Sequence, residues 1–297
     1  MPNGQETTTP QATETNLLVS ANFARANEIY FTSMFGESVR KLTEALGVTR
    51  KISKQAGTTL KTYKVTGTLQ DGTVAEGATI PLSKYETTET PLKEITLKKW
   101  RKATTAEAIL EKGFEQAVTD TTTKMLRQIQ AGIRTSFFSF LATGTSKATG
   151  VGLQAAFANA WGKMQVLFED DAVETVYFVN PTDVANYLGG TPISVQNAFG
   201  MNYLENFLGL GTVIMNASVP AGTFYATAKN NLVLYYIPAG GTDLNRAFTF
   251  TTDETGYIGV HNEPAYDNMT NSTTAISGVE LLADQLTGIV VGTIAAK

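Results

Sequence analysis

His261 is the only histidine in this chain of 297 residues, and histidine is the residue type best suited to metal binding or general-base catalysis. It lies in the segment GVHNEPAYDN, close in sequence to the carboxylates Glu263 and Asp267. A lone histidine rarely makes a site. The pattern therefore favours an ordinary hydrogen-bonded residue at the end of a strand, and a hydrolase that uses His261 is kept as the enzymatic alternative.

Phosphate binding is the next chemistry to consider, because glycines at fixed offsets let backbone N–H groups converge on an anion. Gly209-Leu210-Gly211 matches only the first half of a dinucleotide-binding fingerprint, since Ile214 stands where the third glycine belongs. Lys163 follows a glycine, but Met164 replaces the Ser or Thr that would bind magnesium in a phosphate-binding loop. Neither segment predicts a nucleotide site.

The other reactive patterns are also incomplete. No serine lies in a Gly-x-Ser-x-Gly elbow, and the run Glu169-Asp170-Asp171 lacks the spacing of a calcium loop and fits a solvated face. The absence of cysteine excludes disulfides, thiolate nucleophiles and iron–sulfur sites. We therefore predict no catalytic, metal-binding or cofactor-binding residues, no cofactor and no enzymatic activity.

The formal net charge of -4 hides an uneven distribution of charge. Residues 1–150 contain 19 basic and 14 acidic side chains, whereas residues 151–297 contain 4 and 13. Residues 50–102 alone contain 11 basic and 5 acidic side chains, a balance of +6, which leaves -10 for the rest of the chain. Such asymmetry is typical of a charged tail, a nucleic-acid surface or complementary contacts between proteins.

A nucleic-acid surface is the less favoured interpretation, because the basic segment offers only Tyr63, Tyr85 and Trp100 for base stacking, and these are not grouped. Opposite charges on identical subunits favour head-to-tail contacts that close into rings. We therefore predict that the basic segment contacts another copy of the chain. The candidate contact residues are Lys54, Lys61, Lys64, Lys84, Lys98, Lys99 and Arg101.

Local patterns predict the elements in the first third of the chain. Residues 1–16 have almost nothing to bury and predict a flexible arm, and residues 17–46 predict short helices punctuated by Gly36 and Gly47. In residues 50–102, the segments LKTYKVTGTL and ITLKKW alternate like strands on either side of a turn at Gln70-Asp71-Gly72. They predict one long β-hairpin with mostly polar faces, which needs a partner to cover it.

Two helices are predicted next. Thr104 and Glu107 form a capping box that opens a short helix ended by Gly113. Asp120 is the predicted N-cap of a second helix over residues 121–141, which spans roughly 30 Å. One face of that helix carries the apolar residues Met125, Leu126, Ile129, Ile133, Phe137, Phe138 and Leu141.

The second half of the chain predicts a mixed α+β order. Residues 142–152 (ATGTSKATGVG) predict a linker at a domain boundary. A helix over 153–168, a strand over 174–179 and a helix opened by Asn180-Pro181 follow, and then strands at 212–215, 223–228, 232–237, 248–252 and 257–260. The last strands, at 279–283 and 289–294, are expected to pair with earlier segments and make one domain discontinuous.

Four blocks carry a resemblance to a known family. They are KTYKVTGTLQDGTVAEGATIPLSKYE, ITLKKWRKATTAEAILEKGFEQAVTDTTTKMLRQIQAGI, ETVYFVNPTDVANYL and NASVPAGTFYATAKNNLVLYYI. Together they span most of the chain from about residue 22, and their specificity lies in order and spacing. In this order the chain resembles the major capsid protein of tailed double-stranded DNA bacteriophages, whose fold is named after phage Hong Kong ninety-seven.

The resemblance implies five parts of this phage major capsid fold. They are an N-terminal arm with short helices (1–49), an extended β-hairpin loop (50–102), a peripheral domain with a spine helix (103–150), an axial α/β domain (151–260) and C-terminal strands that return to the peripheral domain (261–297). Copies of the chain are then expected to form pentamers and hexamers of an icosahedral shell around a phage double-stranded DNA genome, without sequence-specific contact to that DNA.

The resemblance also implies partners and a location. A separate scaffolding protein is expected because only a short arm precedes the shell fold, a portal is a further expected partner, and no cross-link is predicted at Lys61 or Lys64. No membrane contact is predicted, since no apolar stretch approaches the ~18 residues of a membrane helix. No signal peptide is predicted either, because the start has no charged segment followed by an apolar core. The expected location is the virion capsid, after assembly in the cytoplasm of the bacterial host. An encapsulin-like compartment that holds a cargo enzyme is the alternative with the same fold.

Overall fold

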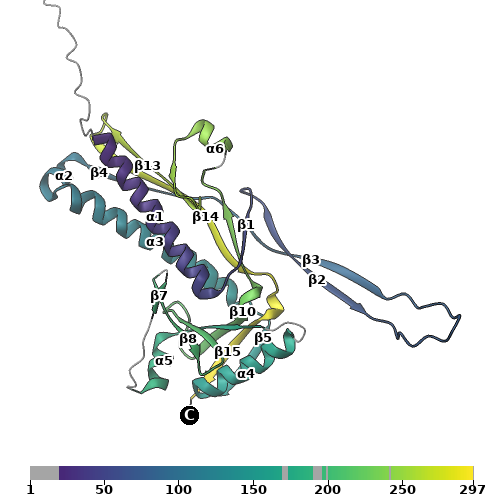
Figure 1. Cartoon of the computed structure of the whole chain (residues 1–297). Coiled ribbons are helices and arrows are strands. Elements are labelled where there is room, and N and C mark those ends of the chain that lie inside the picture. Colours follow the sequence, from purple (N-terminus) through teal and green to yellow (C-terminus); the bar gives the residue numbers. More distant parts are fainter. Residues whose placement is uncertain (1–19, 169–172, 190–195, 199, 241, 297) are drawn as a thin grey trace, which may run out of the picture.

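Two β-sheets, two long helices, several shorter helices and a projecting β-hairpin make up the described part of the protein (Figure 1). The computed structural model describes residues 20–168, 173–189, 196–198, 200–240 and 242–296. The predicted flexible arm at 1–16 and the acidic run at 169–171 lie outside the described residues. Within the described part, no helix combines the length and the apolar character that crossing a bilayer requires.

The first sheet has the strand order β1-β11-β14-β13-β12, with β4 paired to β14 beside this path. Its strands are β1 (Arg50–Ser53), β4 (Lys98–Thr105), β11 (Leu232–Ile237), β12 (Thr251–Thr252), β13 (Ile258–Ala265) and β14 (Thr270–Ala283). The long strand β14 pairs antiparallel with β4 and β13 through its first half and with β11 through its second half. Because β1 pairs parallel with β11, the hairpin begins at this sheet.

The second sheet has the strand order β5-β15-β10-β6-β9-β8-β7. Its strands are β5 (Ser146–Val151), β6 (Thr175–Val179), β7 (Gln196–Ala198), β8 (Met201–Phe207), β9 (Gly211–Met215), β10 (Thr223–Ala228) and β15 (Ile289–Ala295). Helix α4 (Gly152–Leu167) packs on one face, and α5 (Pro181–Leu188) follows β6 as predicted. Asn180 caps α5, because its side-chain oxygen accepts a hydrogen bond from the Thr182 N–H at 2.9 Å.

The sheet pairings correct three of the predicted boundaries. The segment 142–152 is not a linker, since it contains β5, which pairs parallel with β15. The boundary between residues 260 and 261 falls inside β13, and both β11 and β13 belong to the first sheet rather than to an axial domain with the second sheet. Finally, β15 does not return to the first sheet but pairs with β10 and β5 in the second. Composition could not reveal that β15 pairs with β5 and β10, because these segments lie far apart in the chain.

Helix α1 (Ser20–Leu46) is one continuous helix of 27 residues and not the predicted series of short helices. Gly36 does not break it. A Cβ at this position would lie 1.7 Å from Asp253 Oδ2, so the glycine allows a close approach of α1 to the segment that follows β12. Gly47 does end the helix, with a φ of 65° that favours glycine.

The predicted helix over residues 121–141 is confirmed as α3 (Thr121–Leu141), and all seven predicted apolar residues are buried. Its predicted N-cap is wrong: Asp120 has helical backbone angles and makes no capping bond, because a π-helical turn (Glu115–Asp120) leads directly into α3. The short helix α2 (Ala106–Lys112) ends at Gly113 as predicted. Its N-cap is Thr105 and not Thr104, since the Thr105 hydroxyl accepts the bond from the Ala108 N–H.

The predicted hairpin over residues 50–102 is shorter than expected. Its strands are β2 (Thr59–Thr68) and β3 (Lys84–Glu94), which pair only with each other, and ITLKKW is not one of them. That segment instead leads into β4, where Lys98 pairs with Ser277 of the first sheet. Gln70-Asp71-Gly72 does not form the tight turn, because residues 69–83 make a long loop between Thr68 and Lys84. We call this loop the hairpin tip, and residues 54–60 and 93–97 the hairpin root.

Three clusters of buried apolar side chains hold the parts together. The largest joins α1, α3 and both sheets, and it includes Phe35, Phe137 and Phe178. The second lies between α4 and the second sheet, where the rings of Phe157 and Tyr177 stack at 4.4 Å. The third joins the hairpin root to the first sheet through Leu60, Ile95, Val233, Tyr235, Ile237 and Leu282. The remaining short elements are α6 (Thr242–Ala247) and 3-10 turns at Lys229–Asn231 and Leu286–Gly288.

Candidate subunit interface

The hairpin extends beyond the two sheets, and its tip lies far from the body of the molecule (Figure 1). The hairpin tip exposes large apolar side chains: Leu69 is 76% exposed, Ile80 74% and Leu82 94%. Tyr85, the second residue of β3, is 56% exposed. The predicted polar faces therefore describe the strands but not the tip. The segment ATIPL carried the signal that sequence reasoning missed, because two aliphatic residues there flank a proline in a loop.

The net positive charge of residues 50–102 does not lie on the hairpin. Residues 59–94 contain 4 basic and 5 acidic side chains, a balance of -1, whereas residues 50–58 and 95–102 contain 7 basic and no acidic side chains. The predicted basic ribbon is therefore wrong for the hairpin itself. The charge is concentrated where the chain enters and leaves the hairpin, on β1, β4 and the root.

Two lysines of the hairpin strands, Lys61 and Lys84, are paired within the strands. Lys61 Nζ lies 2.7 Å from Glu89 Oε2, and Lys84 pairs with Glu86 two residues away. Such exposed pairs contribute at most about 1 kcal/mol each to stability. The side chain of Lys64 lies outside the described residues.

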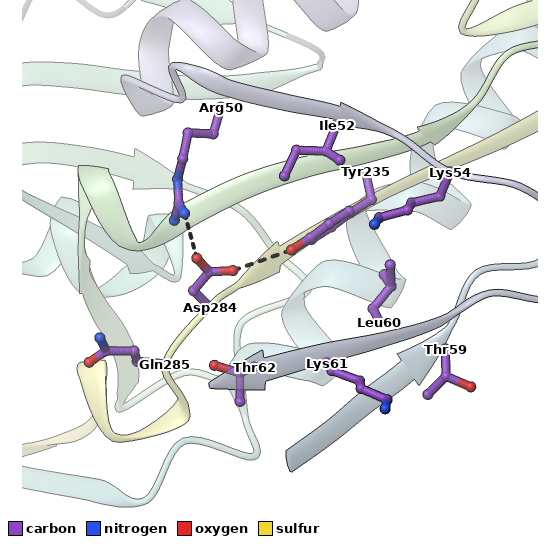
Figure 2. Close-up of a pocket in the computed structure, with 10 residues that line it drawn as sticks. All are labelled: Arg50, Ile52, Lys54, Thr59, Leu60, Lys61, Thr62, Tyr235, Asp284 and Gln285. Atoms are coloured by element: carbon purple, nitrogen blue, oxygen red, sulfur yellow. Dashed lines mark hydrogen bonds and ion pairs between the residues drawn. The ribbon is translucent and has the colours of Figure 1, made fainter. Parts of the chain in front are cut away.

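A cavity of about 350 Å³ opens between β1 and β2 at the hairpin root (Figure 2). It brings together two predicted contact residues, Lys54 and Lys61, which line it with Arg50. Arg50 pairs with Asp284 at 2.6 Å, and the Tyr235 hydroxyl donates a hydrogen bond to the other oxygen of Asp284 at 3.3 Å. Burial, with Asp284 beside it, raises the pKa of Tyr235 to about 12.

Lys98 has a different environment from the other predicted residues, because it binds a buried carboxylate. Glu280 is 2% exposed, and its Oε1 lies 3.0 Å from Lys98 Nζ. Its Oε2 accepts hydrogen bonds from Lys93 Nζ at 3.0 Å and from Ser136 Oγ at 2.9 Å. We call Glu280, Lys93, Lys98 and Ser136 the Glu280 cluster. Sequence reasoning missed Lys93 and Glu280 as a site, although one acid in the apolar run ISGVELLA is typical of a buried, paired charge.

The remaining predicted residues lie on β4. Lys99 and Arg101 are exposed, and Arg101 Nη2 donates a hydrogen bond to Ser272 Oγ of β14 at 2.9 Å. Their neighbour Lys102 points to the opposite face, where its Nζ donates to the Val118 carbonyl at 2.9 Å and to the Thr121 hydroxyl at 2.6 Å. Burial lowers the pKa of Lys102 to about 8. The predicted contact residues whose side chains the structure describes thus do not form one patch.

Among the described residues, the side chains considered for chemistry do not form a metal-binding cluster. His261 lies on β13, with its Nδ1 4.0 Å from the buried carboxylate of Glu28. Glu28 is already bound, since it accepts hydrogen bonds from the Thr251 hydroxyl and the Asn262 N–H. Across the described residues, no three His, Asp or Glu side chains come close enough together to hold a metal ion.

The two candidate phosphate segments have structural roles. Gly209 lies in the turn from β8 to β9, so a strand follows it, whereas the glycines of a dinucleotide-binding fingerprint open a helix. Lys163 lies on α4 and donates a hydrogen bond to the Lys147 carbonyl of β5. These positions support the packing of the second sheet.

Comparisons with known proteins bear on the fold. No family model matches the chain, and no curated protein sequence matches it. Among solved structures, that of Gordonia phage Cozz is similar with a TM-score of 0.55 at 11% identity, and the match covers 86% of this chain and 87% of that one. The capsid of an empty GTA particle is similar with a TM-score of 0.53 at 11% identity, covering 86% and 90%.

A third similar structure is the capsid asymmetric unit of cyanophage A-1(L), with a TM-score of 0.51 at 12% identity, covering 86% of this chain and 92% of that one. At such low identity the likeness is one of fold. It extends over most of the chain and confirms the predicted mixed α+β capsid fold. The chain therefore has the fold of phage capsid proteins, the Hong Kong ninety-seven type.

Proposed function

We propose that this chain is a major capsid protein. In this proposal its copies assemble as pentamers and hexamers into an icosahedral shell around a phage double-stranded DNA genome. The fold supports the proposal, and one observation carries it: the hairpin over residues 59–94 pairs only with itself and extends beyond the body of the subunit.

The physical argument rests on what an isolated hairpin lacks. A two-stranded hairpin is marginally stable in water at best. Here the hairpin tip also leaves Leu69, Ile80 and Leu82 at least 74% exposed. Burying one such side chain contributes about 1.5–3 kcal/mol, so a surface that covers the tip stabilises the contact by several kcal/mol. A second copy of the chain supplies this surface in the proposed shell.

The parts of the subunit are assigned with bounds taken from the sheet pairings. The first sheet with α3 is the peripheral domain, and α3 is its spine helix. The second sheet with α4 and α5 is the axial domain, and β15 belongs to it. The hairpin is the extended loop, and residues 1–49 correspond to the N-terminal arm. Lys54, Lys61, Lys99 and Arg101 are the proposed basic contacts, because they lie at the root cavity or on the exposed face of β4.

Partners and location follow from the same proposal. A separate scaffolding protein guides assembly, a portal occupies one vertex, and the packaged DNA is held without sequence-specific contact. Assembly takes place in the cytoplasm of the bacterial host, and the finished shell is the virion capsid. The role is structural and not enzymatic, so a His261→Ala protein is expected to assemble normally.

Electron microscopy of the purified chain tests the proposal. We expect closed icosahedral particles, formed by the chain alone or with its scaffolding protein, and nuclease-protected DNA inside particles purified from infected cells. Protein that remains monomeric in both conditions contradicts the proposal. Particles that protect a cargo enzyme instead of DNA identify the encapsulin-like alternative.

A further inference from the structure

The Glu280 cluster joins four elements at the point where the hairpin leaves the first sheet. Lys93 comes from β3, Lys98 from β4, Ser136 from α3 and Glu280 from β14. Both carboxylate oxygens are used, since Lys93 and Ser136 donate to Oε2 at 3.0 and 2.9 Å and Lys98 lies 3.0 Å from Oε1. Lys93 Nζ also donates to Ser136 Oγ at 2.7 Å. The hairpin, the sheet and the spine helix are thereby tied to one side chain.

The two lysines lie at the two ends of the short connection from β3 to β4. Lys93 is the penultimate residue of β3, Lys98 is the first residue of β4, and only residues 94–97 separate them. Ile95, within this connection, is fully buried. Because one carboxylate binds both lysines, it couples the direction of β3 to that of β4.

The apolar contacts of the root cannot set this direction alone. Leu60 and Ile95 pack on Val233 and Leu282, and such burial is non-directional. Charge-assisted hydrogen bonds are short and directional. Direction matters because the hairpin strands are about 30 Å long, so a rotation of about 10° at the root moves the tip by roughly 5 Å.

We propose that Glu280 is a positioning residue that holds the hairpin in its docking direction before a second copy binds. The inference rests on the proposed function, in which the hairpin makes the contact between subunits. A hairpin already held in its bound direction costs less ordering entropy when it docks. Glu280 therefore acts through Lys93 and need not itself touch the second copy.

Distances between two spin labels measure the direction of the hairpin. The chain contains no cysteine, so Thr87→Cys on β3 and Gln128→Cys on α3 place labels at two exposed sites without competing thiols. Labelled chain diluted into excess unlabelled chain reports distances within one subunit, whether or not shells form. We expect one narrow distance for the otherwise wild-type protein.

The variants separate positioning from general stability. Lys93→Met keeps the Lys98–Glu280 pair and is expected to lose the narrow distance, whereas Lys93→Arg keeps a charged donor and retains it. Glu280→Gln is expected to broaden the distance as Lys93→Met does. Ile133→Val weakens the core beneath α3 without touching the cluster, so it is expected to lower thermal stability and leave the distance narrow.

A folded Lys93→Met protein that keeps the narrow distance overturns the inference, and so does a distance that broadens equally in Ile133→Val. These readings do not depend on assembly. If the wild-type chain forms no shells but Lys93→Met loses the narrow distance, the proposed function fails and the positioning role of Glu280 stands.

Discussion

Glu280 stays ionised in this protein although it is almost fully buried. Burial by itself raises the pKa of this carboxyl, but Lys98 and Lys93 together outweigh burial and hold it below its ordinary value of 4.5. The opposite strand, β11, places Tyr235 beside Glu280 in register, and the hydroxyl of Tyr235 is bound to Asp284. The lysines from β3 and β4 are therefore the charged groups that decide the ionisation of Glu280.

A Glu280→Gln variant should lower the free energy of unfolding of the unassembled subunit. We expect a loss of about 1–3 kcal/mol, less than for a fully buried pair, because Lys93 and Lys98 are 38% and 35% exposed and can rehydrate. The pKa of Glu280 is lower in the folded than in the unfolded chain. The stability difference between the wild type and Glu280→Gln should therefore have its full value above pH 4.5 and shrink as the pH falls below 4.5. Urea unfolding at several pH values measures it, with exposed Glu86→Gln as the neutral control.

Lys102 should make the stability of the subunit depend on pH under alkaline conditions. Its pKa is about 8 in the folded chain and 10.5 ordinarily, so between these values the folded state binds fewer protons than the unfolded state. Stability relative to a Lys102→Met variant should therefore be constant below pH 8 and rise from pH 8 to 10.5. A difference that is flat over this window contradicts the burial of the amine. Exposed Lys99→Met is the matched control on the same strand.

At the scale of elements, Gly36 lets α1 pack closely against the segment that follows β12. The Asp253 side chain that occupies the space of its missing Cβ is held by the Thr255 hydroxyl at 2.7 Å and accepts from the Gly256 N–H at 3.2 Å. Helix propensity favours alanine over glycine by about 1 kcal/mol, so local preference and tertiary contact disagree at this position.

Gly36→Ala should therefore destabilise the subunit by about 1–3 kcal/mol despite its better helix propensity. Gly132→Ala in α3 is the matched control, because a Cβ there meets nothing within 4 Å. We expect this control to stabilise the subunit by up to about 1 kcal/mol. Chemical denaturation of both variants measures the two effects, and the same sign for both would contradict the close approach at Gly36.

The hairpin tip should matter for assembly and not for the fold of the subunit. Replacing Leu69, Ile80 and Leu82 together by Ser removes side chains that touch little in the isolated chain, so the free energy of unfolding should stay within about 0.5 kcal/mol. Shell formation, followed by electron microscopy, should be lost. A control with Thr66, Thr87 and Thr88 changed to Ser should still form shells. Normal particles from the Leu69, Ile80 and Leu82 variant would show that the tip is not a contact.

At the scale of the whole molecule, the two sheets share one apolar core. The largest cluster contains Phe178 and Ile214 of the second sheet together with Leu234 and Val279 of the first. The chain also crosses repeatedly between the sheets, since β10 and β15 lie in the second and β11 and β14 in the first. Neither sheet can lose its packing without exposing the other.

The subunit should therefore unfold in one cooperative transition. Its two tryptophans report on different parts, since Trp100 packs against the shared core from β4 and Trp161 lies on α4. Fluorescence of the Trp100→Phe and Trp161→Phe variants should give coincident denaturation midpoints that also match circular dichroism. Two separated midpoints would indicate that the sheets fold independently.

Local physics alone determined a large part of this protein. The apolar spacing of α3, the glycine after α2, the Asn180-Pro181 helix start and the alternating strands are visible in the sequence, because each depends on neighbours within a few residues. Their order carried the resemblance to phage capsid proteins, and that resemblance implied the capsid fold. The absence of cysteine also excludes disulfides and thiolate ligands.

The tertiary structure decided which segments meet. ITLKKW leads into a strand beside β14 instead of the hairpin, β15 joins the second sheet, and the basic residues lie at the hairpin root and not along it. Continuous α1 and the burial of Glu280 among two lysines and a serine depend on partners more than 100 residues away. Such contacts gain their energy only when distant segments pack together, so no local pattern records them.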